Sequence, residues 1–240
     1  MAFAPVLHSE WIKIRTLRSL VGALFAIVLA TAAFSALAGL DKKGPDPDPL
    51  FSALFGVSFG QIAAIAFGVT AVSQEFQGGA LRISLAAVPR RGRWFAAKAV
   101  AIGAPVLAVG LVTGAVSLLV GRAVLGTKAS GLTWSVCLRG VVGCGLYLTL
   151  MALFAAGIAA LLRSGIATLS VLVPFLLIVS FVIGGASGTA GDLLPDKAGQ
   201  AVLHQTPDGL LGPWTGLAVT AVWAGLALLA GAWRLERRDA

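Results

Sequence analysis

Charged residues are scarce in this sequence, and their scarcity excludes an ordinary soluble domain. Only 12% of the 240 residues are Asp, Glu, Lys or Arg, whereas 58% are hydrophobic. Soluble domains carry charge on roughly a quarter of their residues. Apolar runs of about 20 residues recur along the whole chain, which is the length that crosses a bilayer as a helix. We therefore predict an all-α membrane protein in which residues 1–240 form a single transmembrane domain.

Histidine and cysteine are nearly absent, with two of each, and this excludes most metal and catalytic sites. Cys137 and Cys144 lie seven positions apart in one apolar run, so on a helix they share a face and are unsuited to a disulfide. His8 and His204 are isolated and form no zinc-ligand cluster. Ser187 lies in a GxSG pattern but has no histidine base in any apolar run. We expect no catalytic residue, no metal and no enzyme activity.

A phosphate-binding loop is also missing. Residues 121–128 come closest to one, with Gly121 and Gly126 at the right spacing. The motif requires Lys directly after the second Gly and then Ser or Thr, whereas here Thr127 precedes Lys128. We therefore expect no cofactor on this chain.

Ionisable groups are almost lacking inside the apolar runs, and this argues against ion-driven transport. The predicted spans are six: about 20–40, 51–73, 99–121, 137–161, 166–185 and 214–233. Only Arg139 falls within them, near one end of the fourth span. Ion-coupled transporters use charged groups within the membrane. If the protein moves a substrate uphill, the energy must enter outside the spans.

The distribution of basic residues predicts the topology. Twelve of the 18 Lys and Arg residues lie in the N-terminal segment, loop 74–98, turn 163–165 and the C-terminus, and six lie in the other loops. By the positive-inside rule, both termini and loop 74–98 are cytoplasmic. This rule also accounts for the net charge of +8 without nucleic acid. We predict a multi-pass protein of a bacterial-type cytoplasmic membrane.

Loop 74–98 has the pattern of a surface helix followed by an anchor. Its apolar residues recur at helical spacing, which predicts an amphipathic helix over residues 75–87 that Pro89 ends. The basic residues and tryptophan that follow are typical of a membrane-surface anchor: Arg90, Arg91, Arg93 and Trp94. The N-terminal residues Trp11, Lys13 and Arg15 belong to a second short amphipathic segment, expected over residues 9–19.

Two motifs resemble one family. The N-terminal segment reads Ser9-Glu-Trp-x-Lys-x-x-x-Leu-Arg-Ser19, and the segment after the second span reads Glu75-x-x-x-Gly79-x-Leu81-Arg82-x-x-Leu85-x-x-x-Pro89-x-Arg91. With six spans and a long external loop, 186–213, before the last, the chain resembles the membrane permease subunit of type-2 ATP-binding-cassette exporters. The second motif is similar to the coupling region of that family. It departs at Ala80, where a threonine is frequent.

The resemblance implies a transport function and its partners. A coupling helix between spans two and three would dock on a separate cytoplasmic ATPase that binds ATP and magnesium, and a second permease copy, expected to be identical, would complete a homodimer. The cargo is not implied, although uncharged spans favour an amphipathic or hydrophobic substrate. The alternative is a stand-alone membrane immunity or resistance protein without an ATPase. The implied partner-binding residues are Glu75, Phe76, Gly79, Leu81, Arg82, Leu85 and Pro89.

Overall fold

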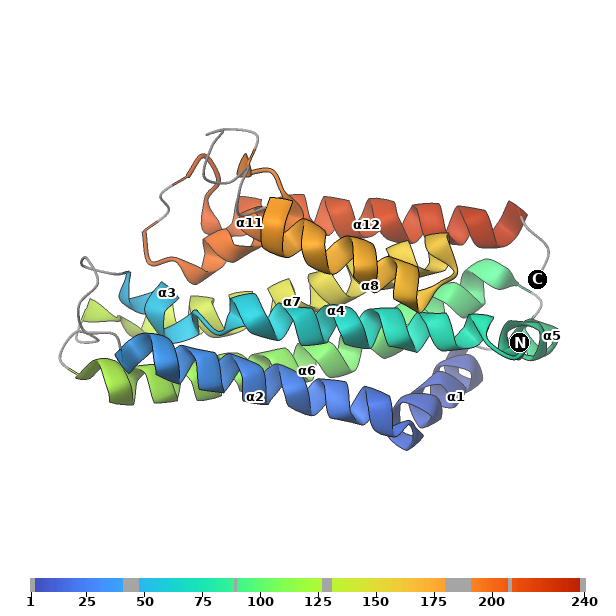
Figure 1. The fold of residues 1–240 in the computed structure, drawn as a ribbon, viewed down its shortest axis with the longest axis horizontal. Coiled ribbons are helices and arrows are strands. Elements are labelled where there is room, and N and C mark those ends of the chain that lie inside the picture. Colours follow the sequence, from blue (N-terminus) through green and yellow to red (C-terminus); the bar gives the residue numbers. More distant parts are fainter. Residues whose placement is uncertain are drawn as a thin grey trace.

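Helices make up the architecture of this chain. The computed structural model describes residues 3–40, 48–88, 90–126, 131–179, 191–206 and 209–237. Within these ranges there are helices, turns and loops but no strand. Figure 1 shows the long helices lying side by side along the longest axis of the molecule. The prediction of an all-α chain is confirmed for the described residues.

Five helices of the described part are long and apolar enough to cross a membrane. They match five of the six predicted spans, and they are α2 (Arg18–Leu40), α4 (Val57–Ser73), α6 (Arg91–Leu125), α7 (Trp134–Leu162) and α12 (Pro213–Arg237). The other predicted span begins as α8 (Gly165–Pro174) and continues as a π-helical segment, Phe175–Val179. Residues 180–185 of this fifth predicted span lie outside the described ones, so the span and the orientation of the termini stay predictions.

The outer surface of the bundle is apolar. Phe25, Leu29, Leu119, Ile166 and Leu229 are between 65% and 83% exposed, although they are large hydrophobic side chains. In water this arrangement would be unfavourable, whereas lipid chains would cover such side chains without loss. The surface therefore fits a membrane protein.

Helix α7 forms the centre of the bundle and packs against α4, α6 and α12. Small residues allow this close approach. A Cβ placed on Gly157 of α7 would lie 2.4 Å from the carbonyl carbon of Ala227 in α12, and one on Gly110 of α6 would lie 2.9 Å from Cα of Gly145 in α7. Glycine is therefore required where these backbones meet, as in many helix pairs packed in lipid.

The two ends of the bundle carry different short elements. Helix α3 (Pro49–Leu54) lies at one end, together with α11 (Pro195–Gln200) and the 3₁₀ turn η4 (Ala201–Leu203). We call this the α3 end. Helix α1 (Phe3–Thr16), helix α5 (Ala80–Ala87) and the C-terminal turn of α12 gather at the other, the α5 end (Figure 1).

A buried polar contact attaches α11 to the bundle. The hydroxyl of Tyr147 in α7 donates to the side-chain oxygen of Gln61 in α4 and accepts from Nε2 of Gln200 at 3.2 Å. Ser58 Oγ lies 3.4 Å from the oxygen of the same Gln200. Tyr147 is fully buried and Gln61 is 3% exposed. These hydrogen bonds connect three elements that are distant in the sequence.

The segment expected to be one helix over 75–87 is divided. The 3₁₀ turn η1 (Gln74–Phe76) follows α4 directly, and α5 begins only at Ala80. Between them Gly78 and Gly79 adopt φ of +59° and +76°, which glycine tolerates and other residues rarely do. The two glycines therefore turn the chain before α5. Helix α6 then begins at Arg91, so the expected anchor forms its first turns.

The N-terminal segment is helical over a longer range than expected. The amphipathic segment was expected over residues 9–19, whereas α1 extends from Phe3 to Thr16. Leu17 interrupts the helix before α2 starts at Arg18. The break sets α1 at an angle to α2, which Figure 1 shows clearly.

Candidate functional site

Three buried charges meet at the α5 end, one from each of three elements. The ammonium of Lys98 in α6 lies 2.6 Å from a carboxylate oxygen of Glu10 in α1 and 2.6 Å from one of Glu75 in η1. All three residues are at most 4% exposed. Lys98 also stands over the ring of Trp94, with Nζ 5.8 Å from the ring centroid. The three charges therefore fix α1 and η1 against the start of α6.

A fourth charge, Lys13 of α1, completes this ion network. Its ammonium lies 2.9 Å from Glu10 and 2.8 Å from Glu75, and 3.4 Å from Ser84 Oγ. Ser84 in α5 donates in turn to Glu75 at 3.1 Å. The network of Glu10, Lys13, Glu75, Ser84 and Lys98 thus joins α1, η1, α5 and α6.

The charges of the ion network balance, with two carboxylates against two ammonium groups. Burial alone would lower the pKa of Lys13, but hydrogen bonds to Glu75 and Glu10 outweigh it and raise the pKa above its ordinary value. A balanced buried network adds little net stability, whereas removal of one member leaves an unpaired buried charge. The arrangement therefore fixes geometry more than it adds stability.

A cavity of about 460 Å³ lies beside the ion network. It is lined by η1, the glycine turn, the first residues of α5 and Arg163, which lies in the turn between α7 and α8. The Arg163 guanidinium stands 5.7 Å from the centroid of the Phe76 ring. The lining residues are Glu75, Phe76, Gly79, Leu81, Arg82 and Arg163. The structure thus brings together five of the seven residues expected to contact an ATPase.

These residues divide into an inner and an outer group. Glu75 and Leu81 are 4% and 5% exposed and face the bundle. Gly79 and Arg82 are exposed, and Phe76 and Leu85 are partly buried. Ile83, between Arg82 and Leu85, is 74% exposed. Pro89 lies outside the described residues.

The expected membrane-surface residues also separate into groups. Trp11, Arg15, Arg90 and Arg93 are exposed, which suits a surface position, whereas Lys13 belongs to the ion network. Arg91 donates to the backbone carbonyl of Leu235 at 2.7 Å, which ties the start of α6 to the end of α12.

Trp94 differs from the expectation of an interfacial anchor. It is only 1% exposed and packs inside the bundle, with its ring centroid 6.4 Å from that of Phe95. The cause is the early start of α6. Because that helix begins at Arg91, residue 94 lies on the face that contacts other helices.

Glu10, Ser84, Lys98 and Arg163 were not expected in the site. For two of them, Glu10 and Lys98, the sequence contains a feature that could have drawn attention to the residue. Glu10 precedes Lys13 by three positions, the spacing of a helical ion pair, and Lys98 is the last charge before a long apolar run. Nothing in the local sequence pairs either residue with Glu75.

A second polar cluster, the Asp48 cluster, lies at the α3 end. Asp48 caps α3 by accepting from the backbone N–H groups of Leu50 and Phe51 at 2.9 and 3.1 Å. Its other oxygen accepts from the N–H of Gln205 and lies 3.6 Å from Nδ1 of His204. The His204 ring stacks on Phe51, with centroids 4.1 Å apart. The segment after η4 is thus attached to α3.

The Asp48 carboxyl has a shifted pKa. Burial alone would raise this pKa, but the nearby His204 imidazole and the N–H donors of Phe51 and Gln205 outweigh it and hold the pKa below its ordinary value. Arg139 of α7 adds to the same attachment by donating to the carbonyl oxygens of His204 and Gln205 at 2.8 and 3.2 Å.

Comparison with known proteins finds no match, either to a family model or to a curated protein.

Proposed function

We propose that this chain is the permease subunit of an ATP-binding-cassette exporter in a bacterial-type cytoplasmic membrane. The α5 end faces the cytoplasm, and a separate ATPase that binds ATP and magnesium docks there on the cavity beside α5. This chain hydrolyses no ATP itself. Six spans form the transmembrane part, and a second identical copy completes the translocation path. The cargo is amphipathic or hydrophobic, since the spans carry almost no charge.

One observation carries the proposal. The cavity at η1 and α5 is lined by the residues of the coupling motif, and a buried ion network lies directly behind it. Glu75 belongs to both, because it lines the cavity and pairs with Lys98. A displacement of η1 or α5 by a partner is therefore transmitted to α6 and α1 through charge-assisted hydrogen bonds, which are short and strong.

The length of α6 suits this role. Its 35 residues span roughly 52 Å at the rise of an α-helix, well beyond the about 30 Å of a hydrocarbon core. The residues from Arg91 to Lys98 extend past the apolar run, and Lys98 belongs to the ion network. One continuous helix therefore connects the docking surface to the membrane interior.

The charges of the α5 end support the orientation. The exposed basic residues there are Arg15, Arg18, Arg82, Arg90, Arg93 and Arg237, and Glu236 of α12 is the one exposed carboxylate among the described residues of this end, since Glu10 and Glu75 are buried and paired. A cytoplasmic position follows from the positive-inside rule. Because Arg82 lines the cavity and is exposed, we expect an acidic side chain on the part of the ATPase surface that docks there.

The test is co-purification of the chain with its ATPase, followed by measurement of ATP hydrolysis and export. We expect Arg82→Glu and Ile83→Glu to weaken the association about tenfold or more, because both side chains are exposed on α5. Arg82→Glu places a charge of the wrong sign on the docking surface, and Ile83→Glu introduces a charge that docking would bury. Arg90→Glu makes the same charge change at an exposed position outside the cavity and is expected to leave association intact.

Two outcomes would contradict the proposal. The first is unchanged association and export in both α5 variants. The second is an equal loss in the Arg90→Glu control, because it would show a general charge effect and no specific docking surface.

A further inference from the structure

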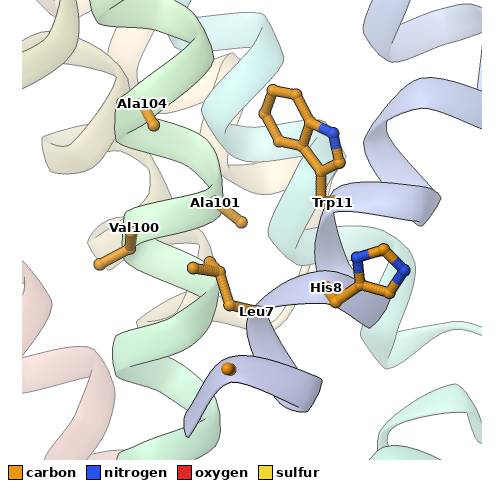
Figure 2. A pocket seen from close by; sticks show the side chains of 7 residues that line it. Leu7, His8, Trp11, Val100, Ala101 and Ala104 are labelled. Carbon is orange, nitrogen blue, oxygen red and sulfur yellow. The ribbon is translucent and has the colours of Figure 1, made fainter.

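A groove separates α1 from α6 at the α5 end, on a face that the coupling motif does not reach. Its volume is about 320 Å³, at the lower end of the range for small-molecule pockets. Figure 2 shows Leu7 extending from α1 toward Ala101 of α6, with Trp11 on the same side of α1. The lining residues are Ala4, Leu7, His8, Trp11, Val100, Ala101 and Ala104.

The walls of this groove are almost wholly apolar. The α6 side consists of Val100, Ala101 and Ala104, and the α1 side offers the side chain of Leu7 and the ring of Trp11. Water in such a groove lacks the polar partners that hold ordered water in proteins. The groove therefore suits a hydrocarbon chain.

The position of the groove is the boundary between polar and apolar parts of the molecule. Lys98 and Glu10 form a buried ion pair, and they are close in the sequence to the groove: Lys98 lies two positions before Val100, and Glu10 lies directly before Trp11. Beyond Val100, α6 continues as an apolar span. Val100 is 46% and Trp11 38% exposed, so the groove opens to the outside of the bundle. Tryptophan at such a boundary is typical of the headgroup level of a membrane.

Basic charge lies along the same face of α1. Residues 4, 7, 8 and 11 follow helical spacing, and Arg15, one turn beyond Trp11, continues this stripe. Arg15 and the nearby Arg18 are exposed, and the only acidic residue of α1, Glu10, is buried in the ion network. A ligand in the groove therefore meets positive charge at one end.

We propose that this groove binds one anionic phospholipid, with an acyl chain between α1 and α6 and its phosphate near Arg15. The apolar walls select a hydrocarbon chain, and the uncompensated basic charge selects an anionic headgroup. The bound lipid fills the space between the two helices on the side that the ion network leaves open. This site does not depend on the proposed transport function.

The test uses the full-length protein in a neutral detergent and native mass spectrometry. Dioleoyl phosphatidylglycerol and dioleoyl phosphatidylcholine are added separately, so that the lipids differ only in the headgroup. We expect one retained phosphatidylglycerol per chain and a preference of about fivefold over phosphatidylcholine, as one basic residue near a lipid surface provides. Arg15→Gln is expected to abolish this preference.

Filling variants test the groove itself. Ala104→Phe places a ring in the groove, and we expect it to lower lipid occupancy about tenfold, because the acyl chain loses its place against α6. Ala108→Phe makes the same change one turn further along α6, at an exposed position that does not line the groove, and should bind like the wild type. Ala4→Leu fills the groove from α1 and serves as a second variant if Ala104→Phe folds poorly.

Quenching of Trp11 by lipids with brominated chains gives an independent measurement. We expect a quenched component in the wild type that Trp11→Phe and Ala104→Phe both lose. Equal occupancy in the Ala104→Phe and Ala108→Phe variants, or equal binding of the two lipids by the wild type, would overturn the proposal. Equal binding would indicate ordinary annular lipid.

Discussion

Lys98 and Glu75 form an ion pair of 2.6 Å between side chains that are each 5% exposed. The two residues are 23 positions apart, and each has a further partner, since Lys98 also contacts Glu10 and Glu75 also contacts Lys13. The pair therefore connects the turn after α4 to the start of α6. Removal of either residue would leave a buried charge without its partner, which lowers the free energy of unfolding.

The first prediction concerns this pair. Lys98→Met leaves Glu10 and Glu75 facing Lys13 alone, and we expect the free energy of unfolding to fall by about 3–5 kcal/mol. Lys98→Met combined with Glu75→Gln should cost less than the sum of the single changes, because the second change removes the stranded charge. The wild type, the two single variants and the double variant form a double-mutant cycle, and thermal unfolding in detergent, followed by circular dichroism, measures their stabilities.

The control for this cycle is Lys197→Met, at an exposed position of α11. Removal of an exposed lysine is expected to change stability by less than about 0.5 kcal/mol. If the stability losses of Lys98→Met and Glu75→Gln simply added in the double variant, the two side chains would not interact as their ion pair indicates.

The second prediction concerns the Asp48 cluster and its dependence on pH. Because the pKa of Asp48 is lowered in the folded state, its ionised form stabilises the fold at any pH above the ordinary carboxyl value of 3.8. This contribution is lost as the pH falls through the lowered folded pKa. Asp48→Asn should therefore be less stable than the wild type at pH 7, and the difference should shrink on acidification from pH about 4 downward.

Thermal unfolding of both proteins between pH 7 and pH 3 checks this dependence. Asn is a good helix cap, so its amide oxygen can keep the cap of α3, whereas its NH2 group takes the place of the oxygen that accepts from Gln205. The substitution therefore removes the charge and one acceptor, and only the contribution of the charge depends on pH in this range. His204→Gln removes the imidazole that lowers the pKa of Asp48, so this variant should lose the stabilising contribution of Asp48 at a higher pH than the wild type does. A difference between wild type and Asp48→Asn that stays constant over this range would exclude a role for the ionised carboxylate.

The third prediction concerns Tyr147, the only tyrosine of the chain. Tyr147→Phe removes a buried hydroxyl that Gln61 and Gln200 share, and it leaves the amide oxygen of Gln61 without this donor. We expect a loss of about 1–3 kcal/mol in the free energy of unfolding. Faster proteolysis of the segment around α11 should accompany this loss, because Gln200 belongs to α11.

The matched control for Tyr147 is the double variant Tyr147→Phe with Gln61→Leu. It removes both polar partners and should recover part of the lost stability, since apolar replacement of both groups is nearly neutral. A double variant less stable than the sum of its single changes would show that Gln61 has another role.

The spans were predictable from the sequence because crossing a bilayer demands only length and apolar composition. Each of α2, α4, α6, α7 and α12 fits a predicted run. A helix was predicted between α4 and α6, and α5 lies there, but the division of the segment at Gly78 and Gly79 was not expected, because positive φ at a glycine leaves no periodic signal. The fifth run stays a prediction beyond Val179.

The ion network was not predictable from the sequence, for a physical reason. Glu10 and Lys98 meet across 88 positions, and such a pair depends on how α1 folds back against α6. Trp94 shows the same limit. Its neighbours Arg91 and Arg93 suggest a membrane surface, whereas the early start of α6 turns its ring into the bundle. Local composition decides which segments are helices, and packing decides which faces meet.

The last prediction tests the contact between α7 and α12. Gly157→Ala would place a Cβ 2.4 Å from the backbone of Ala227, so the two helices must separate, and we expect a loss of about 2–4 kcal/mol. Gly225→Ala in α12 is the matched control, because its Cβ would meet no atom within 4 Å. That control should be neutral or stabilising by up to about 1 kcal/mol, since Ala favours a helix over Gly. Thermal unfolding in the same detergent compares the two variants, and equal stability of both would mean that α7 and α12 do not approach as closely as the structure places them.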